Sequence, residues 1–307
     1  MAILLSGCGK KEAEKELELV TEPIFIAEGV RGVDIVKQDK EIMNIAYEQQ
    51  EYESPFEFWK MDTPYNDEVI VDTEAMIKLY QQLVMIDMQK IEADASVKFD
   101  KPLGKISIEF CQTTEDEREA AVMGQEIDKE NSPSYQVEAD SKAMLLIGDN
   151  DGRGNYYVAY EGAEDKVYTL NEMMVDAVLD VIPFDYILDV SAVADIETMK
   201  NVTIKQDGKT YKISEKQLKE QEYRSLYNEM FSIFVIEENL DASKMGKDAI
   251  IEMAFKRNVK GAPDLHISYH SWDEEKCAVK VNGDAFFLVN SDDVEALKTK
   301  IEEVLVK

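Results

Sequence analysis

At four places along this chain a short strand-like segment gives way to apolar positions that recur every three to four residues. A short apolar or alternating segment is typical of a strand, and the longer period is typical of an amphipathic helix. A residue type that favours a helix N-cap stands at each change: Thr73, Asn171, Ser214, and Asn290 or Ser291. The pattern therefore predicts four helices, each of which follows a strand.

Apolar residues lie at helical spacing behind the first two caps, and we expect them to face a core. They are Met76, Ile77, Tyr80, Leu83, Val84 and Ile86 in the first helix, and Met174, Val175, Val178, Leu179 and Ile182 in the second. Met173 and Met230 have similar spacing and are also expected in the core. Ser214 and Gln217 have the spacing of a capping box, which predicts the start of the third helix.

Paired strand patterns come before these helices. Residues 33–36 and 42–47 flank a turn at 38–40, and residues 202–206 and 210–213 flank an Asp-Gly pair that strongly favours a hairpin. Segments 250–255, 265–269, 277–281 and 286–289 predict a meander with a tight turn at Asn282 and Gly283. We expect an α+β fold of repeated antiparallel β-hairpin or meander units, each closed by an amphipathic helix, in two to three modules.

A chain of 307 residues is long enough for two or three domains. We assign residues 1–7 to the remnant of a signal peptide, 8–22 to a lipidated N-terminus and flexible tether, and 23–98 to a first α+β module. A second module spans 99–198, and the C-terminal module or modules span 199–307. The acidic stretch 113–142 is expected to be a disordered or loosely packed insertion, with a short helix over 115–126.

The first residues end in Leu5, Ser6, Gly7 and Cys8, after which the chain turns hydrophilic. This order resembles a bacterial lipobox, in which two small residues precede the cysteine that carries the lipid. The other interpretation is an ordinary buried cysteine after a chance match. The apolar run before Ser6 is shorter than the h-region of a secretory signal, so we expect that the start codon lies further upstream or that the chain has been cut.

The net charge of −30 narrows the choice of partners. An acidic surface repels phosphate backbones and anionic headgroups, so we expect no nucleic acid and no broad contact between the body and a membrane. High like charge also favours a monomeric body. Cys111 and Cys277 are expected to be buried free thiols, although a disulfide between them remains open from the sequence.

Two segments invite a metal-site interpretation. Residues 148–154 alternate oxygen ligands as a calcium loop does, but position 12 from Asp149 is Tyr160 where an EF-hand has glutamate, so a hairpin turn is favoured. A phosphate-cradling loop is not favoured either, because a strand pattern follows. His266 and His270 would share one strand face about 13 Å apart, too far for one zinc ion, and a solvated face is expected. We expect no metal, no cofactor and no catalytic residue.

The aromatic residues are expected to be structural. Trp59 and Trp272 could form a ligand platform with nearby tyrosines, but Trp59 is expected to pack inside the fold.

Residues 58–64 with the helix over 76–83, then 146–149, 156–160, 167–170 and 175–179, are similar to two motifs of the family called domain of unknown function 4340 (DUF4340). The resemblance covers most of the chain from about residue 33 to residue 188. It implies a fold and no established activity, cofactor or catalytic residue. It also implies bacterial lipoproteins, some of which are encoded beside ABC transporter components of gliding-motility type.

The sequence thus predicts a non-enzymatic, lipid-anchored accessory or scaffold protein at the extracytoplasmic face of the cell membrane. Its anchor would be Cys8, and its partner a membrane complex such as an ABC transporter. The alternative is a lipoprotein that captures a ligand or peptide and delivers it to a permease. A large aromatic cleft between modules would favour capture, and tightly packed modules would count against it.

Overall fold

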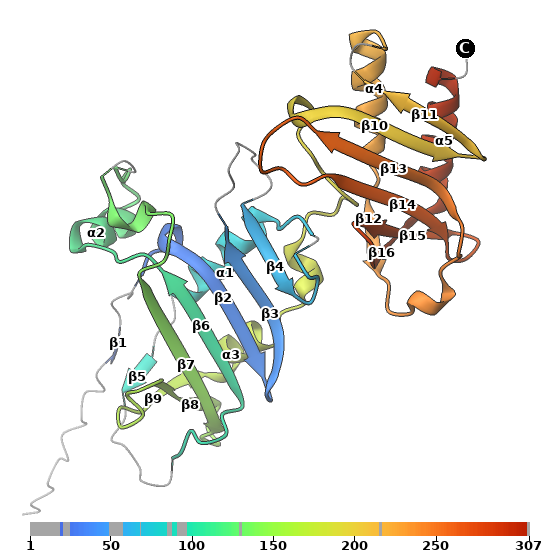
Figure 1. The fold of residues 1–307 in the computed structure, drawn as a ribbon. Helices are drawn as coiled ribbons and strands as arrows, with labels where there is room; N and C mark the ends of the chain where they lie inside the picture. The colour runs from blue at the N-terminus through green and yellow to red at the C-terminus, as the bar shows by residue number, and fades with distance from the viewer. Residues whose placement is uncertain are drawn as a thin grey trace, which may run out of the picture.

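The computed structural model describes residues 19–20, 25–48, 58–67, 69–84, 88–90, 97–128, 131–214 and 217–305. Within them the strands form two antiparallel sheets, each with helices on one face (Figure 1). The α+β class predicted from the sequence is therefore confirmed. The lipobox residues Leu5, Ser6 and Gly7, and the anchor Cys8, lie outside the described residues.

The first sheet has the strand order β1-β5-β9-β8-β7-β6-β2-β3-β4. Helices α1 (Thr73–Val84) and α3 (Glu172–Leu179) cover one face, and α2 (Glu115–Met123) lies beyond the ends of β6 and β7 (Figure 1). The strands are β1 (Leu19–Val20), β2 (Val30–Lys37), β3 (Lys40–Tyr47), β4 (Trp59–Thr63), β5 (Met88–Lys90), β6 (Gly104–Phe110), β7 (Ser141–Asn150), β8 (Asn155–Tyr160) and β9 (Tyr168–Asn171).

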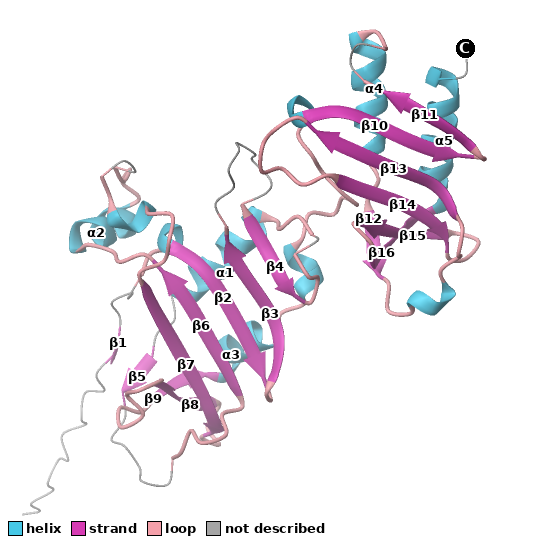
Figure 2. Ribbon diagram, in the orientation of Figure 1, coloured by secondary structure: helices cyan, strands magenta, loops and turns pink. Residues whose placement is uncertain are grey.

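The second sheet has the strand order β11-β10-β13-β14-β15-β16-β12, and α4 (Glu220–Met230) and α5 (Ser291–Leu305) cover one face. In the view of Figure 2, α1 and α3 lie behind the first sheet, and α4 and α5 lie behind the second. The strands are β10 (Met199–Gln206), β11 (Lys209–Ile213), β12 (Val235–Glu238), β13 (Ala249–Arg257), β14 (Leu265–Ser271), β15 (Lys276–Val281) and β16 (Asp284–Asn290). Short 3-10 turns, η1 (Ala27–Gly29), η2 (Pro133–Tyr135), η3 (Pro183–Tyr186), η4 (Ile196–Thr198) and η5 (Ala242–Lys244), complete the two units.

Strands from both of the first two expected modules share one sheet. β2, from residues 23–98, pairs along its length with β6, from residues 99–198. The boundary at 98/99 therefore runs inside this sheet. The second sheet starts with β10 at Met199, where the third expected segment begins. We call the two sheets with their helices the first and second units.

The turn and cap residues account for most of the element boundaries. Asp207 and Gly208 have φ values of 49° and 72°, as the turn between β10 and β11 requires. The side chain of Asn171 accepts a hydrogen bond from the backbone N–H of Met173 at 3.0 Å and so caps α3. The predicted start of the third helix at Ser214 is wrong. α4 begins at Glu220, where Leu218 packs on the core and Glu220 and Glu222 supply the acidic first turn.

Some residues expected in the core lie on the surface. Met173 is 81% exposed, Met174 36%, Ile182 56% and Ile77 45%, whereas Met230 is buried. α3 has only eight residues and rests on the sheet through Val175, Val178 and Leu179, so its first turn faces away. Ile86 lies outside the described residues.

The acidic stretch 113–142 is folded wherever the structure describes it, so the expectation of a disordered or loosely packed insertion is wrong. Its short helix is α2, which begins after Thr114 with a capping box to Glu117. Glu117 is only 6% exposed and accepts hydrogen bonds from the Ser134 hydroxyl at 2.6 Å and the Thr114 backbone N–H at 2.7 Å. The Arg31 guanidinium, from β2, donates to the carbonyls of Gln136 at 2.8 Å and Ser134 at 3.1 Å. These bonds attach the segment to the first sheet.

The Glu117→Gln substitution should destabilise the protein near neutral pH. Burial raises the pKa of this carboxyl, but hydrogen bonds from Ser134 and Thr114 outweigh it and lower the pKa from 4.5 to about 2. The stabilisation is therefore present above pH 4.5 and is lost as the pH falls towards 2. We expect a loss of about 1–2 kcal/mol in the free energy of unfolding at pH 7, measured with urea.

Glu119→Gln makes the same charge change at an exposed site on the same helix and serves as the matched control. An equal loss in both variants, or a Glu117→Gln effect that persists unchanged at acidic pH, would contradict the assigned role of the buried carboxylate.

Cys111 and Cys277 are free and buried, which confirms the expectation of two free thiols over a disulfide. Burial raises the pKa of both thiols, that of Cys277 to about 11. In a Cys8→Ala background we expect negligible reaction of the folded protein with a thiol reagent at mildly alkaline pH. Unfolding without reductant should release two reactive thiols, and release of none would indicate a disulfide.

Candidate functional site at the junction of the two units

One segment, 187–191, connects the first unit to the second and is hydrogen-bonded to both. Towards the first unit, Leu188 N–H donates to the carbonyl of Ile70 at 2.8 Å, and Ile187 forms an antiparallel bridge with Val71. Just before it, the carbonyl of Tyr186 accepts from the backbone N–H of Asp72 at 2.9 Å. The chain that leads into α1 is thereby attached to the connector.

The same connector pairs with the second unit at the start of β12. Ser191 N–H donates to the carbonyl of Ile233 at 2.8 Å, and Val235 N–H donates to the carbonyl of Asp189 at 3.0 Å. Val190 and Phe234 form the bridge between these bonds. The connector therefore behaves as a short strand shared by the two units.

Aromatic side chains fill the junction beside the connector. Tyr65, which follows β4, lies with its ring centroid 5.0 Å from that of Phe287 and 5.5 Å from that of Phe286, both on β16. Phe184, from η3, also packs against Phe287, with ring centroids 5.8 Å apart. The Tyr65 hydroxyl donates to Glu238 Oε1 on β12 at 2.7 Å. A residue of the first unit thus packs across two neighbouring strands of the second.

A second hydroxyl contact fixes the connector to the second core. The hydroxyls of Ser191 and Tyr269 are 3.0 Å apart, and both side chains are buried. Burial is the main cause that raises the pKa of the Tyr269 phenol, and that of Tyr65, so both hydroxyls stay protonated. They act as structural hydrogen-bonding groups.

A cavity of about 80 Å³ remains between the units. Cations, carboxylates and apolar side chains line it, among them Trp59, Lys60, Asp67, Val69, Ser191, Arg257, Asp264, Asn282 and Phe287. Partial burial and then the nearby Asp62 raise the pKa of Asp67, with Lys60 acting in the opposite direction. The volume holds a few water molecules and is well below the roughly 300 Å³ at which pockets for small organic ligands begin.

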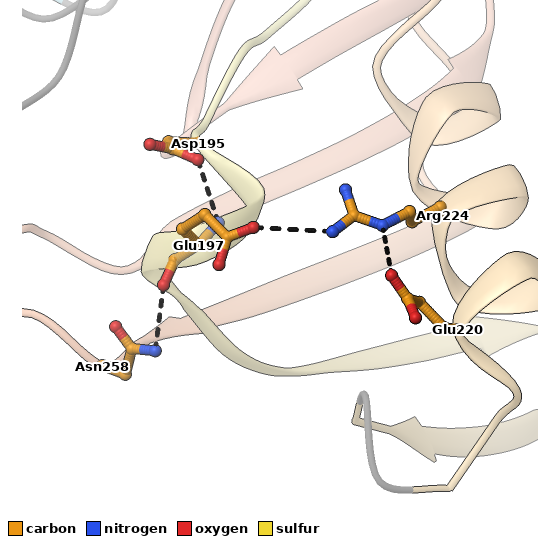
Figure 3. A network of polar contacts seen from close by, with 5 residues as sticks. All are labelled: Asp195, Glu197, Glu220, Arg224 and Asn258. Carbon is orange, nitrogen blue, oxygen red and sulfur yellow. Dashed lines mark hydrogen bonds and ion pairs between the residues drawn. The ribbon is translucent and has the colours of Figure 1, made fainter.

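A polar network holds the entry to β10, on the second-unit side of the connector (Figure 3). Glu197 lies at its centre: its carboxylate is 3.6 Å from Arg224 of α4, and its carbonyl accepts from the Asn258 side chain at 3.2 Å. Asp195 accepts from the Glu197 backbone N–H at 2.9 Å, and Glu220 accepts from Arg224 at 3.2 Å. All of these side chains reach solvent, so we read the network as an orienting contact for the chain after the connector.

The structure separates the other residues that the sequence marked as chemical candidates. His266 and His270 share a strand face as expected, but His270 is buried and not solvated, because its ring bonds to the Gly246 carbonyl and the Ser268 hydroxyl, each at 3.0 Å. Residues 148–150 end β7 and residues 151–154 form the turn to β8, so this segment is a hairpin, as predicted. Among the described residues no group of three or more His, Cys, Asp or Glu side chains could hold a metal ion.

The two tryptophans belong to different units and form no common platform. Trp59 packs against Tyr47 and Tyr80, with ring centroids 5.2 and 5.8 Å away, and also reaches the junction cavity. Trp272 stacks under Lys244 in the second unit. The sequence pattern did not predict the junction. The one signal for it was the unbroken apolar run 286–289, because such a run implies that a strand is buried on both faces.

No helix in the described part of the chain is long and apolar enough to cross a membrane.

Comparison with known proteins defines the class of the chain. A family model described as a domain of unknown function (DUF4340) matches residues 59–252, more than half of the chain. The protein therefore belongs to the DUF4340 family. The match runs from the first residue of β4 into β13, so it includes the connector and parts of both units. Searches of curated proteins and of solved structures gave no match.

The Tyr65→Phe substitution should lower the free energy of unfolding by about 1 kcal/mol, because it removes the hydrogen bond to Glu238 and keeps the ring. A double-mutant cycle with Glu238→Ala should give a coupling of similar size, measured by urea unfolding.

Tyr80→Phe is the matched control. Its hydroxyl is buried in α1 without a hydrogen-bond partner among the described residues, so its loss should be neutral or stabilising. Equal effects of the two substitutions, or a coupling of zero, would show that the hydroxyl of Tyr65 does not hold the units together.

Proposed function

We propose that the protein is a lipid-anchored, extracytoplasmic accessory or scaffold protein without catalytic activity, which presents its folded body to a membrane complex of the ABC-transporter class. The anchor is Cys8, in the lipobox of Leu5, Ser6 and Gly7. This function needs a body of fixed shape more than it needs a ligand site.

The junction carries the proposal. The connector is hydrogen-bonded to both units, Tyr65 packs on two strands of the second unit, and a cavity that described residues of both units line holds only about 80 Å³. A capture protein needs lobes that separate and close around a ligand, together with a cleft to hold it. The packed junction supports the display of a rigid surface over ligand capture, which stays the alternative.

The proposal is tested by crosslinked affinity purification from host membranes with a C-terminal tag. We expect the intact protein to recover permease or ATPase subunits and Cys8→Ala to lose them, because a soluble body cannot stay concentrated at the membrane. Mass spectrometry of the peptide that begins at Cys8 should show the lipid.

A third sample separates the anchor from recognition by the body. Cys8→Ala fused to an unrelated membrane anchor should recover the same subunits if the body recognises them. Recovery of no membrane protein from any sample would remove the accessory role and shift support to ligand capture.

A further inference from the structure

Helix α2 has its polarity reversed. Its one buried side chain is the carboxylate of Glu117, whereas Val122 is 78% exposed and Met123 is 68% exposed. Helices that pack only on their own core turn apolar residues inward and charges outward. The hydrogen bonds from Ser134 and Thr114 to Glu117 hold this reversed orientation in place.

The exposed side of α2 borders a groove of about 490 Å³. One wall is η1 together with the last turn of α1, through Ile26, Ala27 and Val84, and the other is α2, through Ala121 and Val122. Gly124, whose φ of 64° few other residues tolerate, ends the helix and returns the chain so that Ile127 also lines the groove. The volume suits the apolar side chains of a bound segment.

A further exposed apolar residue lies beyond the groove on the same side of α1. Ile77, which is 45% exposed, lies one and two helical turns before Gln81 and Val84 of the groove wall. The apolar residues of the two helices together form a strip suited to one face of a helix. We call the groove and Ile77 the α1–α2 groove.

Acidic groups line the groove and flank it on α2. Glu28 and Glu126 line the groove with a single cation, Arg118, and the exposed side chains of Glu115, Asp116 and Glu119 lie on α2 beside it. An occupant must therefore combine apolar side chains with positive charge. Anionic lipid headgroups do not meet this requirement, and a second copy of a chain with net charge −30 would be repelled.

We propose that the α1–α2 groove is a docking site for a basic amphipathic helix of a partner protein. This proposal specifies the chemistry of the partner in the accessory role proposed above, and it rests on that role. Ile26 is 18 residues after Cys8, so a lipid on that cysteine would hold the groove within roughly 60 Å of the membrane. A membrane protein could reach it with a juxtamembrane or extracytoplasmic helix.

The test uses the full 307-residue chain without lipid and a fluorescein-labelled peptide of leucine and lysine arranged as an amphipathic helix. Fluorescence anisotropy at physiological salt should show saturable binding of this peptide. A peptide of the same composition with its apolar positions scrambled should bind more weakly, because it retains the charge but has no apolar face. Val122→Ser, which changes the groove wall, combined with Met123→Ser at the exposed residue next to it, should weaken binding of the amphipathic peptide at least about tenfold.

Met173→Ser is the matched control, since Met173 is 81% exposed, against 68% for Met123, but lies on α3. It should leave binding unchanged. Because all three positions are exposed, circular dichroism and thermal unfolding should match the unchanged protein. Glu28→Gln with Glu126→Gln should also weaken binding, because these substitutions remove the charge attraction. The loss of affinity should be larger at low salt, where charges are screened less.

Equal affinity of the unchanged protein and the Val122→Ser, Met123→Ser variant would overturn the proposal. Two other results would also overturn it. The unchanged protein could dimerise, or bind anionic vesicles, and the double variant alone could lose that property. The groove would then contact a second copy or a membrane. Peptide binding at the groove with no membrane protein recovered through Cys8 would keep the docking site and remove the accessory role.

Discussion

The arrangement of the molecule depends on the hydrogen bonds that segment 187–191 makes on both sides. Without them, two sheets of ordinary antiparallel design would be joined by a length of chain, and relative motion would be the default. With them, Leu188 is bonded to Ile70 in the first unit and Ser191 to Ile233 in the second. The family match runs through this segment and so includes the hydrogen-bonded connector.

Hydrogen bonds also stabilise a buried charge in the first unit. This chain has a net charge of −30, and Glu117 is a case in which a carboxylate is buried and fully hydrogen-bonded. Burial disfavours its charged form, but hydrogen bonds from Ser134 and Thr114 reverse the balance. The consequence reaches further than the carboxylate, because α2 can fold with its apolar residues outward only if its inward face is a stable polar contact.

The parts of the fold that follow local rules could be predicted from the sequence. Asp207 and Gly208 specify a hairpin turn by their own backbone preferences, and Asn171 specifies a helix start by its side chain. Ser214 shows the limit of such rules: its spacing to Gln217 fits a capping box, yet the helix begins only where Leu218 meets the core. The prediction that Met173 lies in the core was wrong for a related reason. Helical spacing does not specify how many turns of a short helix contact the sheet.

The candidate site could not be predicted because it is made of contacts between distant segments. Tyr65 is separated from Glu238 by 173 positions, and no local pattern links them. The prediction for the acidic stretch around α2 was wrong for the same reason. The stretch is held by the hydrogen bond from Arg31 to the carbonyl of Ser134, two residues that are 103 positions apart.

These long-range contacts also bear on the choice between display and capture. Opening the junction would break the bonds of the connector to one unit and expose the rings of Tyr65 and Phe287 to water. A ligand small enough for a cavity of about 80 Å³ would offer few contacts in return. A ligand can shift a conformational equilibrium only by its difference in affinity for the two states. The energetic balance therefore favours a body that stays closed, and the reversed polarity of α2 gives this body the outward apolar surface that the proposed partner helix would bind.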